Sequence, residues 1–218
     1  MAKKENILLK LTIALTCISV VSAIALSAVY IATKEPIADI KMEKKRAAKI
    51  LVLPGFDANT GTLTEKRTLV EGLRDSLTVT LAHIDNELFG AAVATHTNMA
   101  FSGRFDIMVG FDKEGNILNT EVLSHQETPG LGDKIDKRKD RFPLQFVGKN
   151  PNINNLSVRK DGGEIDAITA ATITSRAFSD AINNAWRAYQ IALKNYELET
   201  ADKTSKGELI TGKEENYE

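Results

Sequence analysis

The sequence predicts an α+β fold in which one N-terminal transmembrane helix precedes a mostly antiparallel sheet flanked by helices. Three patterns support this prediction: an uncharged run from Leu11 to Ala32, a hairpin-like pair of segments between Phe105 and Leu123, and an amphipathic helix from Ser175 to about Leu198. The chain has 218 residues, enough for one membrane anchor and one domain with a substantial core. We therefore expect one dominant function.

The run from Leu11 to Ala32 is long enough to cross the roughly 30 Å of hydrocarbon in a bilayer as a helix. A cleaved signal peptide is the alternative, but the run exceeds a usual signal core and no clear A-x-A site ends it. Lipoprotein processing at Cys17 is disfavoured because the preceding residues poorly match the small residues that it needs. The lysine-bearing leader, residues 1–10, favours a cytoplasmic N-terminus, so we expect an uncleaved anchor and a domain on the periplasmic or extracytoplasmic side.

The remaining elements follow in chain order. From Ile37 to Leu53, charged and apolar residues alternate as in an amphipathic helix leaving the membrane, and Pro54-Gly55 ends the pattern. The strands FDIMVGF and ILNTEVL flank a polar loop from Asp112 to Asn116 that is rich in turn formers. The expected organisation is a cytoplasmic leader (1–10), a transmembrane helix (11–32), a juxtamembrane helix and linker (33–55), a globular domain (56–198) and a polar, flexible tail (199–218).

Charge and composition exclude several classes of function. Acidic and basic residues nearly balance, and no long basic block is present to neutralise a nucleic-acid backbone, so we expect no nucleic-acid binding. The single cysteine, Cys17, lies in the apolar run, so the globular part has neither a disulfide nor cysteine ligands for an iron–sulfur cluster. His83, His96 and His125 lack the spacing of common zinc sites, and we expect no metal site. Redox activity would need an organic cofactor.

The segment from Asp166 to Ser175 is rich in hydroxyl and small side chains and lies where the chain enters the last helix. A helix start offers unpaired N–H groups and a positive dipole end, which suit a phosphate. The alternative is a well-capped helix start, in which the hydroxyl of Thr174 or Ser175 accepts a bond from the helix backbone. The residues alone leave both interpretations open.

Part of this segment resembles a known motif. Asp166, Thr169, Ala171 and Thr172 match the D-x-x-[S/T]-G-A-[T/S] flavinylation motif of the FMN-binding domain family. Ala170 departs from the motif, since the family has glycine there, and a left-handed backbone at this position would be penalised. In that family the last Thr or Ser of the motif carries the flavin.

The order of features along the chain extends the resemblance over roughly residues 11–198. An N-terminal anchor, a middle hairpin, the sequence ETPGLG at Glu127 to Gly132 and the motif before the last helix are together similar to RnfG subunits of Rnf electron-transport complexes. The related NqrC subunits of sodium-pumping NADH:quinone reductase share this kind of domain but are usually longer. Residues 56–198 are thus identified as an FMN-binding domain.

The resemblance implies a cofactor and a set of site residues. FMN is expected to form a phosphoester with the Thr172 hydroxyl, installed by a flavin transferase that uses FAD as donor. Asp166 would assist recognition by that transferase, although a turn residue bonded to local N–H groups is the alternative. The other expected cofactor-binding residues are Thr169 and Ala171 in the motif, Thr174 and Ser175 at the phosphate, and Glu127, Thr128, Gly130 and Leu131 beside the isoalloxazine ring. No catalytic residue is expected.

The function implied by the resemblance is electron carriage within an Rnf-type complex of the bacterial inner membrane. Its partners would be other integral-membrane and iron–sulfur subunits, and the complex would couple electron transfer between ferredoxin and NAD to ion translocation. An NqrC-like subunit and a cofactor-free anchored assembly module are the alternatives. A soluble-type flavin reductase is disfavoured, because no G-x-G-x-x-G sequence follows a strand.

Overall fold

The computed structural model describes residues 2–57, 59–73, 75–85 and 87–214, with side chains for those between 7 and 201. The chain divides into two compact units, residues 1–45 and 46–218, which are described separately. Helix α1 (Ala2–Leu51) contributes its last residues to the second unit.

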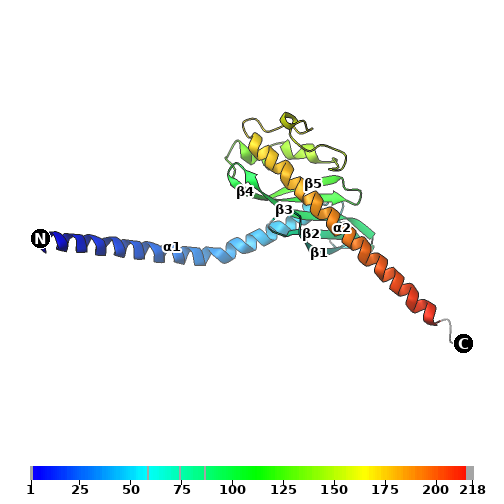
Figure 1. Cartoon of the computed structure of the whole chain (residues 1–218), viewed down its shortest axis with the longest axis horizontal. Helices are drawn as coiled ribbons and strands as arrows, with labels where there is room; N and C mark the ends of the chain where they lie inside the picture. The colour runs from blue at the N-terminus through cyan, green and yellow to red at the C-terminus, as the bar shows by residue number, and fades with distance from the viewer. Residues whose placement is uncertain (1, 58, 74, 86, 215–218) are drawn as a thin grey trace. The chain divides into compact units, whose positions relative to one another are not determined.

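Helix α1 makes up the described part of the first unit (Figure 1). From Ile7 onward it is long and apolar enough to cross a membrane by length and composition. Pro36 lies inside α1 and removes one backbone donor, yet the helix continues on both sides of it. The juxtamembrane helix expected from Ile37 is therefore continuous with the anchor, and it ends at Leu51, slightly before the predicted end at Leu53.

The second unit contains a five-stranded sheet in which each strand pairs antiparallel with its neighbours in the chain (Figure 1). The strands are β1 (Thr62–Thr68), β2 (Leu77–Ile84), β3 (Glu87–Ala100), β4 (Gly103–Asp112) and β5 (Ile117–Ser124). The predicted antiparallel sheet is confirmed, and so is the predicted hairpin, which is formed by β4 and β5. In its turn, the Asn116 backbone N–H donates to Asp112 Oδ1 over 2.7 Å.

Helix α2 (Thr172–Glu214) covers one face of this sheet (Figure 1). The ring of Tyr189 stacks on Phe111 with centroids 5.3 Å apart, and its hydroxyl donates to the Asp112 carbonyl over 2.9 Å. Burial raises the pKa of Tyr189. Phe178 lies further toward the start of α2 and contacts three further aromatic rings, those of Phe105, Phe142 and Phe146. These contacts fix the start of α2 relative to the sheet.

The opposite face is covered by the end of α1 and the turn after it. Alternation along β4 sends Ile107 and Val109 into the core beneath α2, whereas Met108 joins the cluster on the other face. That second cluster contains Ala48, Val52, Leu53, Phe56, Ala82, Ala92 and Met108. A Cβ atom on Gly110 would overlap the Val52 carbonyl, so the glycine permits this close approach.

Helix α2 differs from its predicted range at both ends. It begins at Thr172, before the predicted Ser175, and it reaches Glu214, beyond Leu198. The apolar spacing that guided the prediction stops near Leu198, but the following residues contain good helix formers and no proline. The polar segment expected as a flexible tail is thus helical over residues 199–214, and 215–218 lie outside the described residues.

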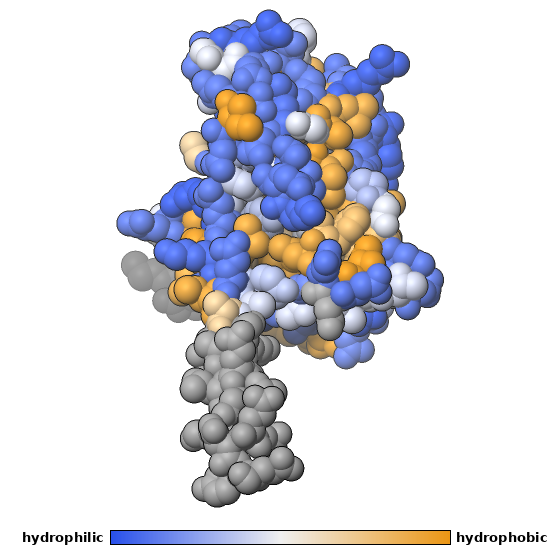
Figure 2. Space-filling model, turned by 90° about the vertical axis from the view of Figure 1, so that its right-hand side faces the viewer, coloured by the Kyte–Doolittle hydropathy of each residue, from blue (hydrophilic) through white to orange (hydrophobic). Residues whose placement is uncertain are grey.

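Between β5 and α2 the chain forms three short 3-10 helices, η1 (Gly132–Ile135), η2 (Phe142–Phe146) and η3 (Arg159–Asp161). Figure 2 shows one face of the molecule, on which hydrophilic residues predominate and apolar residues are exposed between them.

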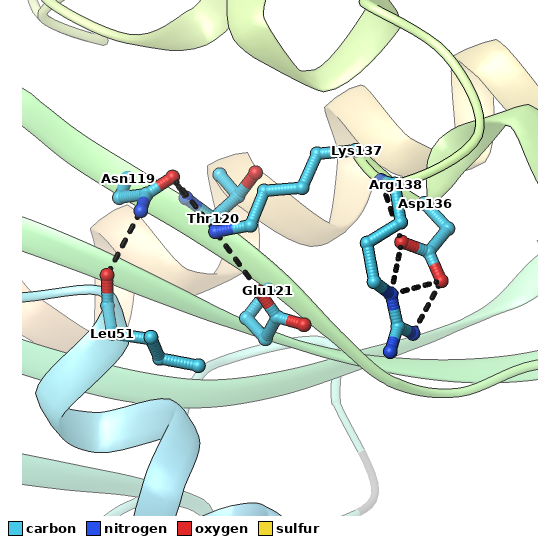
Figure 3. Close-up of polar contacts among 7 residues, drawn as sticks. All are labelled: Leu51, Asn119, Thr120, Glu121, Asp136, Lys137 and Arg138. Atoms are coloured by element: carbon cyan, nitrogen blue, oxygen red, sulfur yellow. Dashed lines mark hydrogen bonds and ion pairs between the residues drawn. The ribbon is translucent and has the colours of Figure 1, made fainter.

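A polar network joins the segment after η1 to β5 and to the end of α1 (Figure 3). Lys137 Nζ lies 2.9 Å from Glu121 Oε2 and 3.3 Å from Asn119 Oδ1. The Asn119 amide nitrogen in turn donates to the Leu51 carbonyl over 2.8 Å. Beside them, Arg138 lowers the pKa of Asp136 to about 2, chiefly through hydrogen bonds from its guanidinium. These contacts hold the region around η1 against the sheet.

Candidate functional site

A cavity of about 330 Å³ lies where the β3–β4 turn, the loop after β5 and the start of α2 meet. Its lining combines apolar side chains with hydroxyls, one carboxylate and the backbone of the α2 start. The lining residues are Phe101, Glu127, Thr128, Leu131, Gly132, Ala170, Ala171, Thr172, Ile173 and Thr174. Six residues predicted from the sequence therefore converge here: Glu127, Thr128, Leu131, Ala171, Thr172 and Thr174.

Thr172 is the first residue of α2 and is half-buried. Its hydroxyl forms no hydrogen bond with any residue that the structure describes. The backbone N–H groups of Thr172, Ile173 and Thr174 likewise have no acceptor among the described residues, whereas the next one, of Ser175, donates to the Ala171 carbonyl over 3.0 Å. Free N–H groups at the positive end of a long helix form a suitable site for an anion.

The neighbouring hydroxyls of Thr174 and Ser175 do not cap this helix, contrary to one expectation from the sequence. Thr174 Oγ1 donates to Glu127 Oε2 over 2.5 Å. Ser175 is fully buried, and its Oγ accepts from the Ile168 N–H over 2.9 Å and donates to the Ala171 carbonyl over 3.0 Å. Both hydroxyls are committed to the protein's own groups, and Ser175 does not line the cavity.

Asp166 and Thr169 also lie outside the cavity. They line a second hollow of about 380 Å³, together with Lys134, Arg141 and other residues. The Asp166 carboxylate lies 2.7 Å from Arg159 Nε, and both side chains are 68% exposed, so their pairing is weak. Since this carboxylate has no local N–H partner among the described residues, Asp166 is not the locally bonded turn residue that the alternative required.

Ala170 has a left-handed backbone, with φ of 63°. The flavinylation motif has glycine at this position, and a non-glycine residue there costs roughly 1–2 kcal/mol. Ala170 therefore adopts the left-handed conformation that glycine adopts without strain, and the alanine side chain makes this conformation strained.

The loop after β5 is built around Glu127, which is 5% exposed. Its Oε1 accepts from the Ser102 N–H over 2.8 Å and its Oε2 from Thr174, so one carboxylate ties together all three segments around the cavity. A Cβ atom on Gly132 would overlap Glu127 Oε2, so only glycine allows this packing. Gly130 has φ of 78° and serves the turn rather than the cavity lining.

Phe101 and Ile173 line the cavity but were not predicted from the sequence. Phe101 is 68% exposed in the turn between β3 and β4, and Ile173 is 49% exposed. No motif marks Phe101, which reaches the site only through strand pairing. Ile173 lies between two predicted residues, Thr172 and Thr174, and the start of α2 at Thr172 explains why it shares their surroundings.

Free hydroxyl and N–H groups beside a partly apolar cavity suit a cofactor that has both a phosphate and a ring system, so the site indicates a cofactor-binding protein. Comparisons with known proteins agree, because a sequence profile of the FMN-binding domain matches residues 101–187. This range includes every residue that lines the cavity.

Curated relatives identify the family more closely. The RnfG subunit of the ion-translocating oxidoreductase complex of Aliivibrio fischeri is 33% identical over 81% of this chain and 87% of its own length. The corresponding protein of Haemophilus influenzae is 33% identical over 85% of this chain and 88% of its own length. That of Vibrio parahaemolyticus is 39% identical over 65% of this chain and 71% of its own length. The chain belongs to the RnfG family of subunits of ion-translocating oxidoreductase complexes.

Proposed function

We propose that this protein carries FMN as a phosphoester on Thr172 and transfers electrons within a membrane-bound ion-translocating oxidoreductase. The observation that carries the proposal is the unbonded Thr172 hydroxyl, which lies in the cavity beside three free backbone N–H groups. The bound flavin would supply electron transfer in one- or two-electron steps. The protein's own residues would tether it, bind its phosphate and exclude water from part of its surface.

The residues present fit such a group. The N–H groups of residues 172–174 can donate to phosphate oxygens, and the helix dipole favours the negative charge there. Leu131, Ile173 and Phe101 offer apolar surface of the kind that contacts an aromatic ring. Among the described residues, no basic side chain lines the cavity, so the phosphate charge would be met by backbone groups alone.

Attachment would occur by transfer from FAD, catalysed by a flavin transferase. The Thr172 oxygen would lose its proton and form a bond to the phosphorus of the FMN half, and the bond to the AMP half would break, releasing AMP. Asp166 and Thr169, on the outer side of the same segment, are accessible for recognition by the transferase. Thr172 itself is a tether and takes no part in electron transfer.

The partners would be integral-membrane and iron–sulfur subunits of an Rnf-type complex, which exchanges electrons between ferredoxin and NAD while ions cross the membrane. Helix α1 would anchor the chain in the bacterial inner membrane, with residues 11–32 in the bilayer and the FMN-binding domain on the periplasmic side. The relatives' shared name, which specifies an ion-translocating oxidoreductase complex, supports membership of such a complex.

The attachment site is tested by expressing the full chain with a flavin transferase and measuring flavin fluorescence on the denatured protein band. Thr172→Ala removes the acceptor oxygen but keeps a helix-compatible residue, so the protein should fold and lose all covalent fluorescence. Thr174→Ala is the matched control that should keep the label, because the Thr174 hydroxyl already donates to Glu127. Undiminished label in Thr172→Ala would place the flavin on another residue.

A further inference from the structure

We infer that the negative charge of Glu127 lowers the reduction potential of the flavin in this cavity. The inference rests on the proposed function, because it concerns the flavin that Thr172 would carry. Glu127 has the only charged side chain among the described residues that line the cavity. No described lysine or arginine forms an ion pair with it, so its charge is not cancelled by a direct partner.

The hydrogen bonds of Glu127 place a donor at each of its two carboxylate oxygens. Both of its oxygens act as acceptors, one from the Ser102 N–H at 2.8 Å and the other from the Thr174 hydroxyl at 2.5 Å. An ionised carboxylate only accepts hydrogen bonds, and short bonds of this kind are typical of a charged acceptor. These two donors stabilise the anion without supplying a full positive charge.

The carboxylate is also fixed in place. Glu127 is 5% exposed, and Gly132 packs so closely that a Cβ atom there would overlap Oε2. The charge can therefore neither turn toward solvent nor be well screened by water, and its field acts at a lower effective dielectric than a surface charge would. This distinguishes Glu127 from the many exposed carboxylates of the chain.

The sign of the effect follows from charge balance. Each electron that enters the flavin adds one negative charge, unless a proton from water follows it. A fixed anion in the same cavity repels that added charge and disfavours the reduced state. Glu127 is thus a positioning residue for charge, not a group that exchanges electrons or protons with the flavin.

The test is a potentiometric titration of the full-length, flavinylated protein in detergent, with dithionite as reductant and flavin absorbance as readout. At about pH 8, Glu127→Gln should shift the potential upward, because it removes the fixed negative charge. We expect a change of about tenfold or more in the reduction equilibrium, or ~30 mV for a two-electron couple. Glu114→Gln, which removes an exposed carboxylate in the β4–β5 turn, should cause no shift.

Thr174→Val separates charge from packing. It keeps the carboxylate but removes the O–H dipole that points at it, so the cavity becomes more negative and the potential should fall. Shifts of opposite sign in the two variants are not expected from loosened packing alone. An unchanged or lowered potential in Glu127→Gln would overturn the inference. If Glu127→Gln does not fold, a raised or unchanged potential in Thr174→Val would overturn the inference. A wild-type protein without covalent flavin would instead overturn the proposed function.

Discussion

At the scale of single residues, Ala170 shows how the chain departs from a motif without losing its conformation. Its φ of 63° lies in the region that glycine enters freely and alanine enters at a cost. The sequence showed that alanine replaces the motif's glycine at position 170. The left-handed backbone there shows that this replacement causes conformational strain. Because Ala170 is exposed, this cost is not offset by burial of its methyl group.

Replacing this alanine should therefore stabilise the domain. Ala170→Gly relieves roughly 1–2 kcal/mol of strain and loses part of that gain to the greater entropy of the unfolded chain. We expect a net increase of about 0.5–1 kcal/mol in the free energy of unfolding. Trp186, the single tryptophan and a buried residue, provides a fluorescence signal for unfolding. A loss of stability would show that the Ala170 methyl group makes a favourable contact.

At the scale of elements, the local patterns were predictable and the contacts between them were not. The β4–β5 hairpin was predicted because its apolar runs flank a turn-rich loop, and Asp112 does bond to Asn116 in that turn. The start of α2 was misplaced because hydroxyl residues suggested caps, whereas Thr174 bonds to Glu127, far away in the sequence. Phe101 could not be assigned to the site, since only the pairing of β3 with β4 brings its turn there.

The packing of Gly132 against Glu127 gives a prediction for these elements. Gly132→Ala should destabilise the domain by about 1–3 kcal/mol, because the new methyl group overlaps a buried carboxylate. In a Glu127→Ala background the same change should cost much less, since the obstructing side chain is gone. Unfolding followed by Trp186 fluorescence completes this double-mutant cycle. If the losses in the free energy of unfolding of the two single variants added up to that of the double variant, Gly132 would be required for another reason.

At the scale of the whole molecule, the chain comprises an apolar helical unit and a cofactor-binding unit. The uncharged run predicted the first unit, and the resemblance to the FMN-binding domain family predicted the second. The sequence also suggested a separate juxtamembrane helix, but Pro36 does not interrupt α1. Because the second unit follows α1 in the chain, the side of the membrane on which the flavin lies depends on the direction in which α1 crosses it.

That direction is open to a protease test. The lysines of residues 1–10 should keep the N-terminus in the cytoplasm, so the FMN-binding domain should lie outside the inner membrane. Protease added to intact spheroplasts should then digest the domain, while a cytoplasmic marker protein survives. Digestion only after lysis would reverse the proposed topology.

The most direct measurement is the intact mass of the protein, which is first purified from its native membrane together with its partners and then denatured. We expect a mass that exceeds that of the chain by one FMN less one water, as a single phosphoester requires. Fragmentation should place the addition on the peptide that contains Thr172. An unmodified chain that co-purifies with its membrane partners would contradict covalent attachment of FMN and favour an anchored assembly module without a covalent cofactor.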